Sequence, residues 1–392
     1  MLASTPHIGI DCRLAGQRHA GIGRYTANLV KFLLAQPRSK EFSWQLFFHD
    51  QDQADEVLLG VQKQSSVSVQ YSPVQHYTLR EQLLMPAAFG RAHLDLLHVP
   101  HFNVPLSYVG PFVVTIHDLL WHEHRGQGVT TLPRWQYWMK YQAYRVVVQR
   151  ALQQAKVVFV PTNTIRAAVL QQAPGIAQKL KVTPEGIDEV YRDAGVAAVS
   201  LQEAAAAWSA VGLPPKTPYV LYVGSLYPHK NVGLIVRALK QLPKLHLVVV
   251  GTRSVFQEEL RQAVAHEGVK AQVHFAGYIP DEKLVAVLKL SVALIQPSLH
   301  EGFGLTGVEA LSVGARVLAS DIPIFHEVYG KAATFFDPQQ VDSLVGVITQ
   351  VLSETPKAKK QWQQEGQQVI AQYSWSSLAK QTLNTYAQVL RK

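Results

Sequence analysis

The chain has 392 residues, 47% of them hydrophobic, which is more than one hydrophobic core usually serves, so we expect two soluble domains. Its formal net charge of +9 favours anionic partners such as nucleotides or phospholipid surfaces. The single cysteine, Cys12, excludes an internal disulfide and a cysteine-based metal cluster. No window is apolar enough to span a membrane and residues 1–6 lack a signal-peptide pattern, so we expect a cytoplasmic protein.

Short apolar runs alternate with helical patterns along the chain, which is typical of strand–helix units in parallel sheets. We therefore predict an α/β fold with two doubly wound sheets. The predicted strands are residues 8–11, 44–48, 96–99, 112–116, 157–160, 219–223, 245–250, 273–275, 293–296 and 317–319. The predicted helices include residues 25–34 and 135–152.

An Ala-rich stretch within residues 196–218 precedes a new strand and marks the expected domain boundary. We expect one domain over residues 1–200 and another over residues 201–375, with a ligand cleft between them. Ligands of open parallel sheets bind beyond the carboxyl ends of the strands. This rule selects the loops that follow residues 10, 116, 223, 275 and 296.

Gly21 and Gly23 follow the first strand and open a helix, so backbone N–H groups there could face an anion. A plain glycine-permitted turn is the alternative. Thr26 stands where a dinucleotide fingerprint has its third glycine, which weighs against a hydride-transferring dehydrogenase.

The segment 297–311 carries the richest pattern, since its glycines postpone a helix to about Thr306. Glu301 is then expected in the loop and Glu309 in the first helical turn, with the amides of residues 302–305 between them. Amides at a helix start suit a phosphate, and carboxylates accept hydrogen bonds from hydroxyls. A ligand with sugar hydroxyls beside a pyrophosphate fits this arrangement. The alternative is that Thr306 with Glu309, and Ser298 with Glu301, form helix capping boxes.

Lys230 lies in the loop after another strand, where a lysine can neutralise a diphosphate. Asn231 is expected to cap the next helix. The histidines show no ligand spacing on an identifiable helix, so we expect no metal ion.

A stretch from Arg125 to Arg166 contains no acidic residue and interleaves basic and aromatic side chains. This mixture indicates a helix at a membrane surface, and the alternative is an ordinary amphipathic helix whose aromatic residues pack on a sheet. The aromatic residues in question are Trp135, Tyr137, Trp138, Tyr141 and Tyr144. A nucleic-acid partner is not expected, because charge is spread almost evenly between the two halves and no recognition module is visible.

The pattern Pro-Ser-x-x-Glu-Gly-Phe-Gly-Leu-x-x-x-Glu-Ala, from Pro297 to Ala310, resembles the Glu-x7-Glu motif of retaining glycosyltransferases in family 4. That group has two facing Rossmann-like domains, the GT-B fold, and includes bacterial polysaccharide mannosyltransferases. The likeness continues through residues 314–321, 327–328 and 336–338, and upstream through residues 114–119.

The resemblance implies a role for each matching residue. Glu301 and His117 are expected at the reacting sugar, Glu309 at the ribose and Lys230 at the diphosphate. The resemblance likewise implies donor-binding roles for Gly21, Gly23, Tyr278 and Ile279. The further candidate donor-binding residues are Ser225, Arg253, Gly302, Phe303, Gly304 and Leu305. Ser225 lies in the region where many relatives have an arginine, and Arg253 is a candidate substitute. The resemblance also implies that residues 376–392 form a helix crossing back to the first domain, and that no metal is required.

The sequence thus favours transfer of a hexose to a saccharide or lipid-linked saccharide acceptor in cell-surface polysaccharide synthesis. The preferred hexose is mannose, and the preferred donor is GDP-mannose. The enzyme is then expected at the inner face of the plasma membrane, on an anionic surface. The alternatives are a UDP-sugar donor, or a catalytically silent protein that binds a nucleotide sugar or a polysaccharide.

Overall fold

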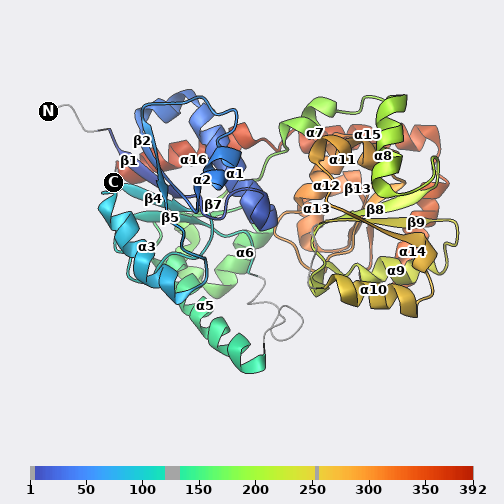
Figure 1. Cartoon of the computed structure of the whole chain (residues 1–392), viewed down its shortest axis with the longest axis horizontal. Coiled ribbons are helices and arrows are strands. Elements are labelled where there is room, and N and C mark those ends of the chain that lie inside the picture. Colours follow the sequence, from blue (N-terminus) through green and yellow to red (C-terminus); the bar gives the residue numbers. More distant parts are fainter. Residues whose placement is uncertain (1–4, 120–132, 252–255, 392) are drawn as a thin grey trace. The chain divides into compact units, whose positions relative to one another are not determined.

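The computed structural model describes residues 5–119, 133–251 and 256–391, which form two compact units. The first unit ends at Gly186 and resumes at Ser374, and the second runs from Ile187 to Tyr373. Each unit is one parallel sheet covered by helices (Figure 1). The chain is therefore divided after Gly186 rather than after residue 200, because helix α7 (Glu189–Ala194) packs against a helix of the second unit.

The first unit has a seven-stranded parallel sheet with the order β3-β2-β1-β4-β5-β6-β7. Its strands are β1 (His7–Asp11), β2 (Ser43–Phe48), β3 (Val67–Tyr71), β4 (Leu96–Val99), β5 (Phe112–Thr115), β6 (Val158–Val160) and β7 (Leu180–Val182). Its helices include α1 (Ala20–Ala35), α2 (Gln51–Val57), α3 (Leu79–Arg91), α5 (Arg134–Gln154), α6 (Asn163–Gln172) and α16 (Trp375–Leu390). The strand order reverses between β1 and β4, where Ile8 pairs with Trp44 on one side and Leu96 on the other.

The last helix, α16, belongs to the first unit although the second unit precedes it in the chain. It packs against α1, and its Tyr386 is fully buried. The Tyr386 hydroxyl lies 2.5 Å from Nδ1 of His98 on β4, whose Nε2 lies 3.0 Å from the Thr115 hydroxyl on β5. This buried polar chain ties the end of the protein to the middle of the first sheet.

The second unit has a six-stranded parallel sheet with the order β10-β9-β8-β11-β12-β13. Its strands are β8 (Tyr219–Val223), β9 (His246–Val250), β10 (Val273–Gly277), β11 (Ala293–Gln296), β12 (Val317–Ser320) and β13 (Ala333–Phe336). Its longer helices are α8 (Leu201–Val211), α9 (Gly233–Leu239), α10 (Gln257–His266), α11 (Asp281–Leu290), α12 (Leu305–Ser312), α13 (Pro323–Tyr329), α14 (Val341–Leu352) and α15 (Pro356–Ile370). The predicted α/β class with two Rossmann-like sheets is confirmed.

The core of the second unit forms where α9 and α14 cover the apolar strands of this sheet. Strands β8 and β11 are neighbours at the point where the strand order reverses. Loops at such a switch point diverge to opposite faces of the sheet and leave room for a ligand. Among the described helices, none is both long and apolar enough to cross a bilayer.

Candidate active site

The loops after β8 and β11 bring together the lysine and the first glutamate of the predicted site. Lys230 ends a short 3-10 helix (Pro228–Lys230) after β8, and Glu301 lies between β11 and α12. The Lys230 Nζ is 2.7 Å from Oε1 of Glu301, and the two side chains are only 20% and 16% exposed. Ser298 donates a second hydrogen bond of 2.9 Å to the same carboxylate oxygen. Because the parallel strands are adjacent, this pair sits at the switch point of the second sheet.

Asn231 fixes the relative position of these loops. Its backbone is left-handed, with φ of 54°, and its side-chain amide donates to the carbonyls of Pro297 at 3.2 Å and Pro338 at 2.9 Å. The amide of Leu299 also donates to the carbonyl of His229 at 2.8 Å. The expectation that Asn231 caps the next helix is wrong, because its side chain joins three loops and α9 has no side-chain cap.

Gly304 and Tyr329 hold the turn from the Glu301 loop into α12. Gly304 has φ of 91°, and the Tyr329 hydroxyl on α13 donates to its carbonyl at 2.6 Å and also bonds Oε1 of Gln296. A Cβ at Gly304 would lie 2.2 Å from that hydroxyl, so only glycine fits. Burial, with the nearby Glu301 carboxylate, raises the pKa of Tyr329 well above its usual value, so the hydroxyl remains a donor.

At the start of α12 the amide of Gly307 donates to the carbonyl of Gly304 at 3.0 Å, and the amides of Leu305 and Thr306 precede this bond at the positive end of the helix. Gly304 is the N-cap and Thr306 already lies inside the helix, where its hydroxyl accepts from Gln296 at 2.8 Å. Neither capping box is therefore present. Glu309 lies in the second turn of the same helix rather than in the first turn as expected, because α12 begins at Leu305, and it is only 1% exposed.

The remaining donor-side residues of the second unit differ in accessibility. Phe303 is buried against the edge of the Tyr373 ring, with ring centroids 5.2 Å apart, while Gly302 and Leu305 are half-buried. Ser225 follows β8, and its carbonyl accepts from the Tyr222 hydroxyl. After β10, Tyr278 is 56% exposed, whereas Ile279 is buried. Arg253 lies outside the described residues.

His117 lies in the first unit, directly after β5, and is 8% exposed. Its Nε2 is 3.0 Å from the carbonyl of Pro100, which can only accept, so this nitrogen carries a proton. Its Nδ1 is 3.5 Å from Oε1 of Glu185, and the Tyr25 ring stands edge-on at 4.5 Å. Glu185 has no sequence signal of its own, since it lies far along the chain from His117.

Gly21 and Gly23 lie within the first turn of α1 rather than in a loop before it. A Cβ at Gly23 would lie 2.1 Å from the carbonyl of Gly16, whereas one at Gly21 would meet nothing within 4 Å. The amide of Gly16 donates to the carbonyl of Gly23 at 3.0 Å. Gly23 therefore permits the close approach of α1 to the loop after β1.

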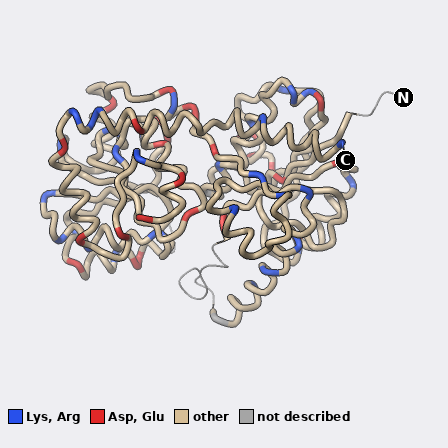
Figure 2. The backbone as a smooth tube through the Cα atoms, turned by 180° about the vertical axis from the view of Figure 1, so that it is seen from behind, with Lys and Arg blue, Asp and Glu red and all other residues tan. Residues whose placement is uncertain are grey.

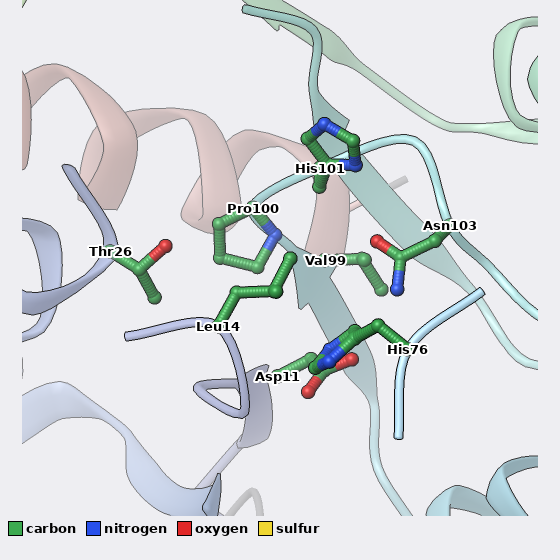
Figure 3. A pocket seen from close by; sticks show the side chains of 8 residues that line it. All are labelled: Asp11, Leu14, Thr26, His76, Val99, Pro100, His101 and Asn103. Atoms are coloured by element: carbon green, nitrogen blue, oxygen red, sulfur yellow. The ribbon is translucent and has the colours of Figure 1, made fainter. Parts of the chain in front are cut away.

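A small pocket opens at the switch point of the first sheet, between β1 and β4 (Figure 3). Its lining residues are Asp11, Leu14, Thr26, His76, Val99, Pro100, His101 and Asn103. Asp11, His76 and Glu81 have metal-ligand atoms within 4.8 Å of one another. However, Arg13 is 2.7 Å from Asp11 and 2.9 Å from Glu81, so its guanidinium already pairs with both carboxylates.

The electrostatics of this cluster agree with that pairing. Although burial opposes its charge, the Arg13 guanidinium holds the pKa of Asp11 below its usual value. Burial lowers the pKa of His76 to about 3, so its ring is neutral at physiological pH. The Arg13 guanidinium thus already occupies the place of a cation between these two carboxylates, so the cluster does not fit a metal ion.

Two protein-family models match most of the chain, one in each half. Residues 19–190 match the family described as Glycosyltransferase Family 4, and residues 207–369 match the one described as Glycosyl transferases group 1. The chain belongs to glycosyltransferase family 4. The resemblance to family 4 that the Glu-x7-Glu motif indicated is confirmed, and the chain is an enzyme that transfers a sugar.

Several relatives of this glycosyltransferase have described activities. O-antigen chain mannosyltransferase B of Escherichia coli is 26% identical over 93% of this chain and 95% of its own length. O-antigen chain mannosyltransferase RfbU of Salmonella typhimurium is 31% identical over 35% of this chain and 39% of its own. Among solved structures, Anabaena HepE in complex with UDP and glucose has a TM-score of 0.73 and 20% identity, and covers 98% of this chain and 99% of its own. The last likeness establishes the GT-B fold.

Proposed function

We propose that this glycosyltransferase transfers mannose from GDP-mannose to a saccharide or lipid-linked saccharide acceptor in cell-surface polysaccharide synthesis. The main support for a donor site here is the ion pair of Lys230 and Glu301 at the switch point of the second sheet, beside the start of α12. The choice of mannose is supported by the E. coli relative, which matches nearly the whole chain.

In this proposal the donor lies along the carboxyl edge of the second sheet. Lys230 and the first amides of α12 bind the diphosphate, because both supply positive charge. Glu301 accepts hydrogen bonds from the sugar hydroxyls, and Glu309 accepts them from the ribose. Tyr278 is the exposed aromatic residue after β10 that suits stacking on the base.

The chemistry we propose is transfer with retention of the anomeric configuration. The bond between the anomeric carbon and the diphosphate oxygen breaks, and the acceptor hydroxyl forms its new bond from the same face. The acceptor's proton passes to the departing diphosphate oxygen, so atoms and charge balance. Lys230 and the helix start stabilise the charge on the leaving group, at a few kcal/mol for each well-placed donor.

No metal ion is required in this scheme, since Lys230 and the start of α12 supply the positive charge at the diphosphate. Transfer is then expected to be unchanged by a chelator. A rate that falls on chelation and returns with added Mg²⁺ or Mn²⁺ would contradict this part of the proposal.

A UDP-sugar is the second candidate donor, because the Anabaena neighbour was solved with UDP and glucose. Transfer assays with GDP-mannose, UDP-glucose, UDP-galactose and UDP-N-acetylglucosamine separate the two. We expect GDP-mannose alone to support turnover, with an α-linked product by NMR. Exclusive turnover of a UDP-sugar would overturn the donor assignment, and a β-linked product would overturn retention.

A further inference from the structure

Helix α5 presents two apolar faces, and one of them packs in the first unit. The buried residues recur at helical spacing and are Tyr137, Tyr141, Tyr144, Val148 and Ala151. The Tyr144 ring stands edge-on to Phe102 at 4.9 Å, in the loop after β4. This stripe is what an ordinary amphipathic helix needs to hold its place on a sheet.

The outward side of α5 carries large hydrophobic side chains that are exposed to a large extent. Trp135 is 63% exposed, Trp138 46%, Met139 60% and Val146 53%. At about 100° per residue Trp135, Met139 and Val146 fall on the side of the helix away from the tyrosine stripe. Trp138 lies at the border of the two sides, where its ring stands edge-on to Tyr137 and Tyr141. We call these four residues the α5 outer face. The aromatic residues of the sequence pattern thus divide, with tyrosines inside and tryptophans outside.

The charge on α5 has one sign. The helix contains Lys140, Arg145 and Arg150 besides its first residue, and no aspartate or glutamate. Lys140 and Arg145 are exposed and lie on opposite sides of the helix, at the borders between the buried stripe and the outer face, whereas Arg150 donates to the carbonyl of Tyr108 at 2.6 Å. Figure 2 shows basic and no acidic positions along this projecting helix.

The position of α5 places this face near the functional edge of the first sheet. The helix lies between β5 and β6, which are parallel, so it begins on the carboxyl side of the sheet. Its 21 residues extend about 31 Å, far more than the three or four residues of the adjacent strands. Figure 1 shows α5 projecting beyond the sheet.

We propose that the α5 outer face docks on the surface of a bilayer containing anionic phospholipid. Tryptophan is suited to the interface between headgroups and acyl chains, and the flanking basic residues suit headgroup phosphates. Met139 and Val146 favour lipid over nucleic acid, since aliphatic side chains provide no stacking surface for bases. This inference stands on the helix alone and does not depend on the donor or acceptor assigned above.

Vesicle flotation tests the proposal with the full chain and without any sugar donor. Wild-type protein is expected to float with phosphatidylcholine vesicles that contain phosphatidylglycerol, and not with phosphatidylcholine alone. The double substitution of Lys140→Gln and Arg145→Gln is expected to lower vesicle binding about 25-fold, at roughly fivefold for each charge. The double substitution of Trp135→Ser and Trp138→Ser is expected to lower vesicle binding roughly tenfold or more.

The matched control is the double substitution of Lys357→Gln and Lys360→Gln, which removes two exposed charges from α15 in the second unit. This control is expected to leave vesicle binding unchanged. Circular dichroism and thermal unfolding verify that each variant is folded. Three results would overturn the proposal: no flotation of the wild type, equal flotation with neutral vesicles, or an equal loss in the α15 control. Capture of a single-stranded oligonucleotide that depends on α5, with no vesicle binding, would also overturn it.

Discussion

Lys230 and Glu301 form an ion pair of 2.7 Å between the loops after β8 and β11, and Ser298 supports the same carboxylate oxygen. In the proposed mechanism the lysine must leave this partner to reach a diphosphate. Glu301 therefore orders the lysine before the donor arrives and competes with the donor for its charge.

Replacing Glu301→Gln removes this competition while keeping the shape of the side chain. We expect free GDP to bind roughly threefold to tenfold more tightly, because Lys230 loses a charged partner. Sugar transfer is expected to slow at least about 100-fold, because the carboxylate at the sugar hydroxyls is lost. Calorimetric titration with GDP and a transfer assay measure the two effects.

The control for that variant is Glu267→Gln, which breaks the ion pair of Lys240 and Glu267 in the same unit. Lys240 is 56% exposed, so this pair contributes little and neither GDP binding nor transfer is expected to change. Weaker GDP binding by the Glu301 variant would show that the glutamate does not compete for Lys230.

Asn231 is expected to stabilise the site through its side chain rather than through its backbone. Asn231→Gly keeps the left-handed conformation but loses the bonds to Pro297 and Pro338. The free energy of unfolding is expected to fall by about 1–3 kcal/mol, with weaker GDP binding. Lys216→Gly, at another position of positive φ, serves as the control in urea unfolding and is expected to stabilise slightly. An Asn231→Gly protein as stable as wild type would contradict the three-loop bridge.

Gly304→Ala is expected to destabilise the second unit by about 2 kcal/mol or more. The added Cβ meets the Tyr329 hydroxyl at 2.2 Å, and φ of 91° is unfavourable for alanine. Gly346→Ala, in the exposed part of α14 with nothing within 4 Å, is expected to stabilise by roughly 0.5–1 kcal/mol. Thermal unfolding compares the two, and equal melting temperatures would contradict the tight packing at Gly304.

His98 makes the first unit sensitive to acid. Burial lowers its pKa from the ordinary value of 6.5 to about 3, so the unfolded chain binds a proton that the folded protein does not. Stability is therefore fully present above about pH 6.5 and is lost as pH falls towards 3, by up to about 1.4 kcal/mol per pH unit. His98→Gln is expected to have a shallower slope in urea unfolding between pH 7 and pH 5. An unchanged slope would assign the acid sensitivity to other groups.

The sequence predicted the central strands of both sheets well but missed β3, β7 and β13. All three are edge strands, and β3 is partly or fully exposed along its whole length. An edge strand packs on fewer neighbours, so its hydrophobic alternation is weaker and the periodic signal is lost. The central strands are buried on both faces and read as continuous apolar runs.

The site was predictable to the level of loops. Parallel strands end at one edge, so the loops with Lys230 and Glu301 could be expected to meet there. The hydrogen bonds that hold these loops could not be predicted. Asn231 donates to carbonyls of residues far along the chain, and Tyr329 donates to the carbonyl of Gly304 from another helix. Such contacts depend on tertiary geometry, which a local pattern does not encode.

The most direct test of the donor site compares GDP with GMP in wild type, Lys230→Ala and the control Lys240→Ala. Wild type and the control are expected to prefer GDP by about tenfold or more, because the β-phosphate meets the Lys230 charge. In Lys230→Ala this preference is expected to shrink about tenfold, to what the amides of α12 alone provide, while GMP binds as before. A preference for GDP that is as large in Lys230→Ala as in wild type would place the diphosphate elsewhere and contradict the proposed site.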